Sequence, residues 1–311
     1  MPVNTHLSMF AGLPVHRFVP GDGLPDDPSA VAWRLEVDDF DAPPEEFAEL
    51  FAAFLEQVPA HTVRAVVVGE WGSAYEQPPP VGLLAGAARR LTALRALFLA
   101  DLVGEQCEIS WINQDDVTPL LTAYPHLEVL RVRGAQDLRL APVRHGGLRE
   151  LAVESGGLPG TVVRAVGGCD LPALTHLELW LGVPDYGCDT TVDDLAGILD
   201  GRGLPALRHL GLRNAAIADP VAAAVATAPV VPRLAVLDLS MGMLTDDGAA
   251  ALLAGQPLTH LERLDLHHHF LSPERARQLT GRLPGVDVDL SGAREPRSYQ
   301  GRSYRYTAVA E

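Results

Sequence analysis

The sequence contains no lysine, only three cysteines and no long hydrophobic run. Its positive charge comes from arginine alone, and acidic residues outnumber basic residues by 40 to 24, which gives a net charge of −16. Because negative charge repels phosphate backbones, we expect no nucleic-acid partner. No window approaches the roughly 18 apolar residues of a membrane-spanning helix, and the first residues lack a signal-peptide pattern. We therefore expect a cytoplasmic protein with no membrane partner.

Recognisable catalytic motifs are missing as well. The sequence has no nucleophile elbow, phosphate-binding loop, zinc-protease motif or dinucleotide fingerprint. Cys107, Cys169 and Cys188 are too few and too widely spaced for a disulfide framework or a zinc knuckle, so we expect free structural thiols. These absences favour a protein without catalytic residues, metal or cofactor, which is not an enzyme.

One repeated pattern, Leu-x-x-Leu-x-Leu, stands in place of such motifs. Seven full copies begin at Leu94, Leu127, Leu148, Leu174, Leu207, Leu234 and Leu261. Weaker copies begin at Ala32, Val63 and Val286. Successive starts from 32 to 261 are 21 to 33 residues apart, which leaves room for a returning helix in each unit. The alternation within each copy predicts a short strand with one face in the core.

Helical patterns lie between the predicted strands. From Pro44 to Val58 the apolar residues recur on one helical face. Asp219-Pro220 and Ser272-Pro273 each read as an N-cap followed by a first-turn proline. Thr191 with Asp194 fits a capping box. The chain therefore alternates strand and helix, which predicts an α/β fold with a parallel sheet.

These repeats resemble the leucine-rich repeat superfamily, in the helix-containing form seen in ribonuclease inhibitor. The resemblance implies an α/β solenoid of about nine to ten repeats, with a curved parallel sheet on the concave face and helices on the convex face. We assign residues 1–31 to an N-terminal segment and cap, 32–291 to the solenoid and 292–311 to a basic, Tyr-rich tail. The family's buried Asn after the strand is replaced by Ala215, Gly242 and His269 in the last three full units.

A narrower resemblance rests on "GEWGSAYE", "EISWINQDDVTPLL" and the tail. These segments are similar to those of a bacterial family of uncharacterised leucine-rich repeat proteins. That resemblance implies a partner enzyme and no activity in this chain.

In a solenoid the residues between and after the strand leucines form rows on the open face. The first predicted row contains Glu36, Val67, Phe98, Arg131, Ala152, Glu178, Gly211, Asp238, Asp265 and Asp287. The second contains Asp38, Gly69, Ala100, Arg133, Glu154, Trp180, Arg213, Ser240, His267 and Asp289. The expected function is non-catalytic protein binding, because arginine and tryptophan are enriched at binding hot spots. The candidate binding residues in these rows are Arg131, Arg133, Trp180, Arg213, Asp238, Asp265 and His267.

Aromatic residues gather where early strands end. Trp71 and Tyr75 follow one strand, and Trp111 with Asn113 follows the next. Two interpretations stay open: the rings cover the solenoid edge, or Trp71, Tyr75, Trp111 and Asn113 form the lip of a partner-binding surface.

Three consecutive histidines, His267 to His269, raise the alternative of a metal-dependent or accessory subunit of an enzyme complex. Neighbouring strand residues point to opposite faces, so at most two of the three could bind one ion. A site would need Asp238 or Asp265 beside His267.

The tail interleaves arginines with tyrosines. It contains Arg294, Arg297, Arg302, Arg305, Tyr299, Tyr304 and Tyr306. It could remain disordered, or it could dock on acidic surface formed by Asp238, Asp265, Asp287 and Asp289. We favour docking, because arginine would relieve repulsion among these acids.

Overall fold

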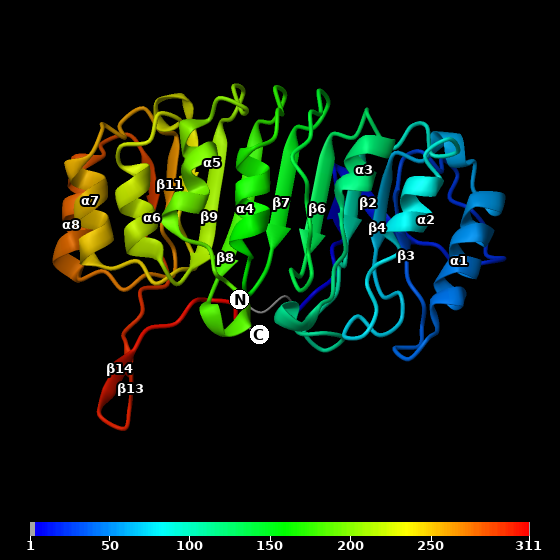
Figure 1. Ribbon diagram of the computed structural model, residues 1–311, viewed down its shortest axis with the longest axis horizontal. Coiled ribbons are helices and arrows are strands. Elements are labelled where there is room, and N and C mark those ends of the chain that lie inside the picture. The colour runs from blue at the N-terminus through cyan, green and yellow to red at the C-terminus, as the bar shows by residue number, and fades with distance from the viewer. Residues whose placement is uncertain (1–3, 311) are drawn as a thin grey trace. The chain divides into compact units, whose positions relative to one another are not determined.

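The computed structural model describes residues 4–310 (Figure 1). The chain forms two compact units. The N-terminal unit contains residues 4–154 and 170–172. The C-terminal unit contains residues 155–169 and 173–310. In both units short strands alternate with helices, as the sequence pattern predicts.

Strands of the N-terminal unit lie side by side in chain order. They are β1 (Met9–Phe10), β2 (Leu13–Arg17), β3 (Ala32–Leu35), β4 (Ala65–Val68), β5 (Ala96–Leu99), β6 (Val129–Arg133) and β7 (Glu150–Glu154). β1 pairs antiparallel with β2, and each later pair from β2 to β7 is parallel. The connecting helices are α1 (Pro44–Gln57), η1 (Ala60–Thr62), α2 (Val81–Gly86), η2 (Ile109–Trp111) and α3 (Thr118–Ala123). The parallel sheet thus begins at β2, within the segment assigned to the cap.

The C-terminal unit repeats this arrangement with β8 (His176–Gly182), β9 (His209–Ala215), β10 (Val236–Asp238), β11 (Arg263–Asp265) and β12 (Asp287–Asp289), all parallel. Its helices are α4 (Gly160–Gly167), η3 (Pro184–Tyr186), η4 (Val192–Leu195), α5 (Ala196–Asp200), α6 (Ala218–Val225), η5 (Val231–Arg233), α7 (Asp246–Ala254) and α8 (Pro273–Arg282). In Figure 1 these helices lie over one face of the strands. The other face is called the open face below. A hairpin, β13 (Arg297–Tyr299) and β14 (Arg302–Tyr304), follows β12.

The core lies between the strands and the helices. In the C-terminal unit Leu177, Leu210, Leu237 and Leu264 occupy one register position on four neighbouring strands, and all are fully buried. In the N-terminal unit Trp33 packs edge-on against Phe54 of α1, with ring centroids 5.7 Å apart. The predicted leucine positions therefore form a continuous hydrophobic layer within each unit.

Two of the predicted helix starts are confirmed. The Ser272 hydroxyl accepts a hydrogen bond from Arg275 N at 3.2 Å and caps α8. Thr191 and Asp194 form the capping box that opens η4. The third prediction is wrong, because α6 begins before Asp219, at Ala218. The Asp219 carboxylate instead accepts a bond from Thr245 N at 2.7 Å, so it serves the start of α7 in the next repeat.

The predicted register is wrong by two residues at both ends of the series. Trp33 pairs with Val66, so Arg34 and not Glu36 lies beside Val67. Trp33 takes the place of a strand leucine because its large ring fills the core against α1. At the other end Asp265 pairs with Asp289 and not with Asp287. The weak copies lack the leucines that fix the register.

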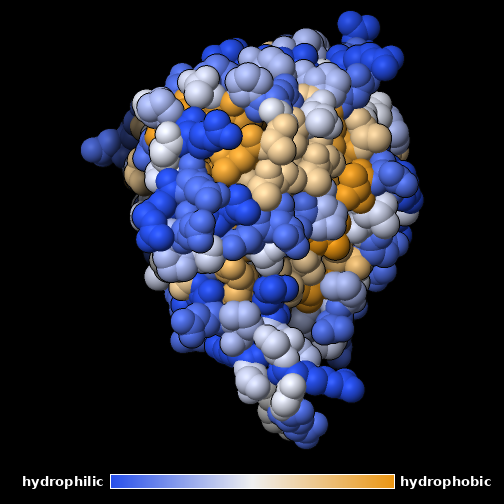
Figure 2. All heavy atoms as spheres, turned by 90° about the vertical axis from the view of Figure 1, so that its left-hand side faces the viewer, coloured by the Kyte–Doolittle hydropathy of each residue, from blue (hydrophilic) through white to orange (hydrophobic). Residues whose placement is uncertain are grey.

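The last helix, α8, is mostly polar. Leu279 is its only fully buried residue among the described ones, and its exposed side carries charged residues such as Glu274. Figure 2 views the chain from the side where α8 lies: hydrophilic side chains cover much of this surface and surround a smaller apolar area. A polar outer helix suits the end of a repeat series, because no further repeat covers it.

Candidate functional site

The open face of the N-terminal unit is covered by the chain's own first residues. Phe10 packs on Phe98 with ring centroids 5.9 Å apart, and Leu7 joins the same hydrophobic cluster. Val67 and Phe98, expected to face solvent, are fully buried here. That expectation was wrong, since these apolar strand residues need a cover and the N-terminal segment supplies it.

Asp101 lies at the centre of a buried ionic network under this cover, and its side chain is fully buried. Its carboxylate contacts Arg34 Nη1 at 2.6 Å and Arg133 Nη1 at 3.3 Å. It also accepts a hydrogen bond from Leu7 N at 3.1 Å. A buried carboxylate with this many donors is fully compensated, so Asp101 ties the N-terminal segment to the strands.

Arg131 and Arg133, two predicted binding residues, are paired with acids of the neighbouring strand. Arg131 Nη2 lies 2.9 Å from Glu150 Oε1, and Arg133 Nε lies 2.8 Å from Glu154 Oε2. The Arg133 guanidinium also lies over the Phe98 ring, 5.1 Å from its centroid. Arg133 is buried and Arg131 is partly exposed, so only Arg131 offers surface here.

An exposed aromatic cluster lies at the ends of the early strands. The rings of Tyr75 and Trp111 stack with their centroids 6.2 Å apart. The ring of Phe40 packs edge-on against Tyr75, with the centroids 6.3 Å apart. The exposed fractions of Phe40, Tyr75 and Trp111 are 38%, 41% and 44%. Asn113 fixes the supporting loops by hydrogen bonds to the carbonyl groups of Ala74 and Tyr75. We call Phe40, Tyr75 and Trp111 the aromatic cluster.

Trp71 does not belong to this surface. It is 2% exposed, and its indole N–H donates to Gln77 O at 3.1 Å. Its prediction as part of the lip was therefore wrong, because the ring fills the interior below the loop. Phe40 was missed because it lies outside the repeat pattern, in the loop before α1.

In the C-terminal unit three predicted residues come together on the open face. Arg213 lies over the Trp180 ring, 5.4 Å from its centroid, and its Nε lies 3.1 Å from Asp238 Oδ2. Its Nη1 bonds Glu178 Oε1 at 2.7 Å. Burial raises the pKa of Asp238, although Arg213 opposes the shift. Arg213 thus neutralises two acids in neighbouring repeats.

Asp265 and His267 form a second group on this face. His267 Nδ1 lies 2.7 Å from Asp265 Oδ1, and Asp289 completes a set whose ligating atoms lie within 4.8 Å of one another. Of the two aspartates expected as possible partners of His267, Asp265 lies in this set of described residues and Asp238 does not. Burial opposes ionisation of Asp265, but bonds from His267 and Arg263 outweigh it and hold its pKa well below the usual range. Arg263 binds both aspartates, at 2.9 and 2.7 Å, so their negative charge is already compensated.

His268 and His269 diverge from His267, as expected. His269 Nε2 lies 3.0 Å from Leu290 O, and Leu271 N donates to its Nδ1 at 3.1 Å. His269 thereby bonds the turn backbone at the position where leucine-rich repeats, which the sequence resembles, carry Asn. Burial lowers the pKa of both His268 and His269.

The end of the tail lies against repeats of its own unit, the C-terminal one. Val309 N donates to Asn214 Oδ1 at 3.0 Å, Ala308 N donates to Met241 O at 2.8 Å, and His268 Nε2 lies 3.0 Å from Tyr306 O. The three residues that the tail contacts, Asn214, Met241 and His268, follow one another at intervals of 27 residues, and all three have positive φ. The tail therefore crosses three successive repeats where their strands end.

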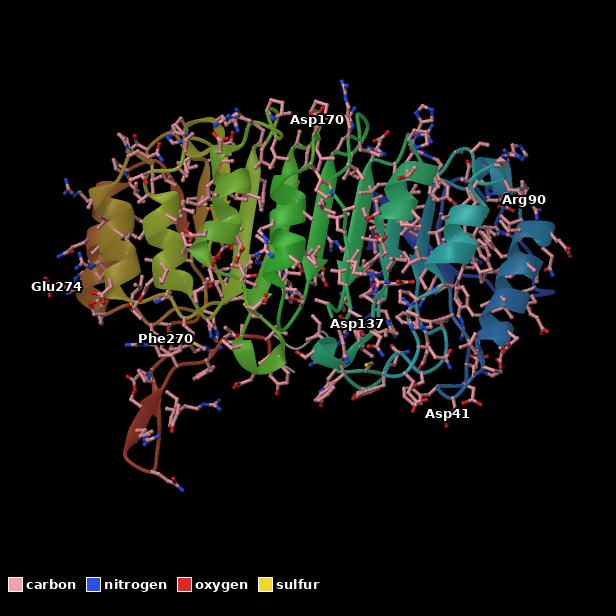
Figure 3. All side chains as sticks on the ribbon, in the orientation of Figure 1. Asp41, Arg90, Asp137, Asp170, Phe270 and Glu274 are labelled. Atoms are coloured by element: carbon pink, nitrogen blue, oxygen red, sulfur yellow. The ribbon has the colours of Figure 1, made fainter. Side chains whose placement is uncertain are left out.

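This surface is not the acidic one expected for the tail. Within the described residues, Asp238 pairs with Arg213, and Asp265 pairs with Arg263 and His267. Tyr306 is held by ring contacts: its centroid lies 5.6 Å from that of Phe270, which Figure 3 labels near the start of the tail. The Tyr299 side chain lies outside the described part of the chain, while the rest of the hairpin is exposed.

A comparison with solved structures finds a protein of similar fold. The chain resembles a crystal structure of a Bacteroides fragilis protein solved as a structural-genomics target, with a TM-score of 0.74 and 29% sequence identity. The match covers 84% of this chain and 75% of that one. No protein-family model matches, and no curated protein matches. Within the described residues, no helix is both long and apolar enough to span a bilayer.

Proposed function

We propose that this chain is a leucine-rich repeat solenoid of about nine to ten repeats that acts as a non-catalytic protein-binding scaffold in the cytoplasm. The strand–helix units in chain order support the repeat assignment. Within the described residues Cys107, Cys169 and Cys188 are buried and form no disulfide, which suits a reducing compartment. The net charge of −16 disfavours nucleic acid as the partner.

The aromatic cluster carries the proposal. Tyr75 contacts both Phe40 and Trp111, and each of the three residues is more than a third exposed. Tyrosine and tryptophan dominate hot spots because they bury large area at little conformational cost. Beside the cluster lies a hollow of about 510 Å³. It is lined by Glu76, the residue after Tyr75, and by apolar groups including Leu83. A protein partner could cover the rings and insert a side chain there.

A comparative pull-down tests the proposal. Full-length protein, the double variant Tyr75→Ala/Trp111→Ala and the control Tyr304→Ala are immobilised and exposed to lysate of the native host. Tyr304 is a matched control because it is an aromatic residue, 45% exposed, in the tail hairpin. We expect one protein to be retained by the wild type and by the control but lost from the double variant.

The captured protein is then purified, and its affinity for each variant is measured by calorimetry. Loss of two hot-spot aromatics should weaken binding by more than about 2 kcal/mol, or about 30-fold. Equal binding by all three proteins would contradict the assignment of the aromatic cluster. If the partner is retained by the wild type and the double variant but not by Tyr304→Ala, the hairpin and not the aromatic cluster is the binding surface.

A further inference from the structure

Two histidines and one glutamate meet on the open face of β8 and β9. His176 and Glu178 are two residues apart on β8, so their side chains point to the same face. His209 of β9 is the register partner of His176. The two imidazole rings stack with centroids 3.9 Å apart and planes 15° apart. A ligating atom from each of the three side chains lies within 4.8 Å of the others.

Glu178 is held so that one oxygen faces the histidines. Its Oε1 accepts bonds from Trp180 Nε1 at 2.6 Å and Arg213 Nη1 at 2.7 Å. Its Oε2 lies 3.5 Å from His176 Nε2. The hydrogen bonds to Oε1 fix the direction in which Oε2 points. Residues that hydrogen-bond metal ligands orient those ligands in the same way.

A glycine gives the carboxylate its room. Gly211 is the register partner of Glu178, and a Cβ there would lie 3.2 Å from Glu178 Cγ. Because that position has no side chain, Glu178 can lean across β9 toward His209. The Arg213 charge beside the site is also balanced by Asp238 at 3.1 Å, so the group as a whole keeps a negative charge.

We propose that His176, Glu178 and His209 form a binding site for a zinc-class divalent cation. Two imidazole nitrogens and one carboxylate oxygen are a donor set that Zn²⁺ takes, at about 2.0 to 2.2 Å each. Donors around a tetrahedral ion at those lengths lie about 3.4 Å apart. Because the lone pair of an imidazole nitrogen lies in the ring plane, at least one of the two stacked rings must turn out of the stack for both nitrogens to reach one ion. Water or a partner's side chain would supply the fourth ligand.

The Asp265, His267 and Asp289 group is the weaker site. Arg263 donates to both aspartates, so a cation there must displace a guanidinium. No arginine bonds the Oε2 atom of Glu178 among the described contacts. The inference goes beyond the protein-binding proposal and does not depend on it.

Calorimetry on the untagged full-length protein, freed of metal by a chelator, tests the site. Zn²⁺ is titrated into the wild type, His176→Gln, His209→Gln and Glu178→Gln, with Mg²⁺ as a control ion that prefers oxygen ligands. We expect one Zn²⁺ per chain, and an affinity loss of at least about tenfold in each variant. His126→Gln, a change at an exposed histidine outside both groups, should bind like the wild type.

Two further measurements make the outcome decisive. Co²⁺ in place of Zn²⁺ should give visible absorption bands of a tetrahedral ion in the wild type and not in His176→Gln. Melting curves without metal establish that each variant is folded, and Glu178→Gln replaces any histidine variant that is not. The proposal is overturned if the wild type binds no Zn²⁺ or if His176→Gln binds it unchanged. It is also overturned if binding is abolished by His267→Gln, a change in the weaker group, and by none of the other variants.

Discussion

Asp101→Asn should strongly destabilise the N-terminal unit. Asp101 is fully buried and compensates Arg34 and Arg133 at the same time. Removing one partner of a buried ion pair costs about 3 to 5 kcal/mol, because the other charge stays buried. Each arginine keeps a second carboxylate, Glu36 or Glu154, so we expect the low end of that range, about 3 kcal/mol.

Asp38→Asn is the matched control in the same unit, because Asp38 pairs with Arg17 but its side chain is 88% exposed. An exposed pair contributes about 0 to 1 kcal/mol. Urea unfolding followed by tryptophan fluorescence measures the difference, since three of the four tryptophans, Trp33, Trp71 and Trp111, lie in the N-terminal unit. If both variants lose stability equally, the buried network does not hold the N-terminal segment.

Three other perturbations follow from the packing and the tail. Leu210→Ala should cost about 2 to 5 kcal/mol, whereas Val288→Ala on the partly buried last strand should cost about 1 kcal/mol, and equal losses in urea unfolding would contradict the packing described. Asn214→Ala should lower the free energy of unfolding by about 2 to 4 kcal/mol, because it breaks hydrogen bonds to Val309 and puts Ala at a φ of 54°. Asn214→Gly should be about 1 kcal/mol more stable than Asn214→Ala in calorimetric melting, and equal stability of the two variants would argue against backbone strain. Because burial lowers the pKa of His269 in the folded state, stability should be full above pH 6.5 and fall as the pH drops below that value, with a smaller fall in the melting temperature of His269→Asn.

The strong repeats could be predicted because each carries its own evidence. Leu210 and Leu237 fill the same core position, and the period-two pattern around them fixes which face they take. Ser272 also acts locally, since a cap bonds a residue three positions away. Features that depend on neighbouring residues in the sequence were therefore found.

Features that join distant residues could not be read in this way. The bond from Leu7 N to Asp101 spans 94 positions, and neither residue belongs to the repeat pattern. His176 and His209 lie 33 positions apart and meet only because β8 and β9 pair in one particular register. The aromatic cluster was found in part, through Tyr75 and Trp111, since both follow strands.

The N-terminal segment changes how the repeats of its unit depend on one another. In a simple repeat array each unit contacts its neighbours alone, so losing one repeat shortens the array and leaves the rest intact. Here Leu7 and Arg34 both contact Asp101, from positions 94 and 67 residues earlier in the sequence. Deleting or duplicating a whole repeat between β3 and β5 would move Asp101 by one strand and break both contacts. The contacts of the N-terminal segment therefore fix the number of repeats from β3 to β5. They place no such constraint on the number of repeats after β5.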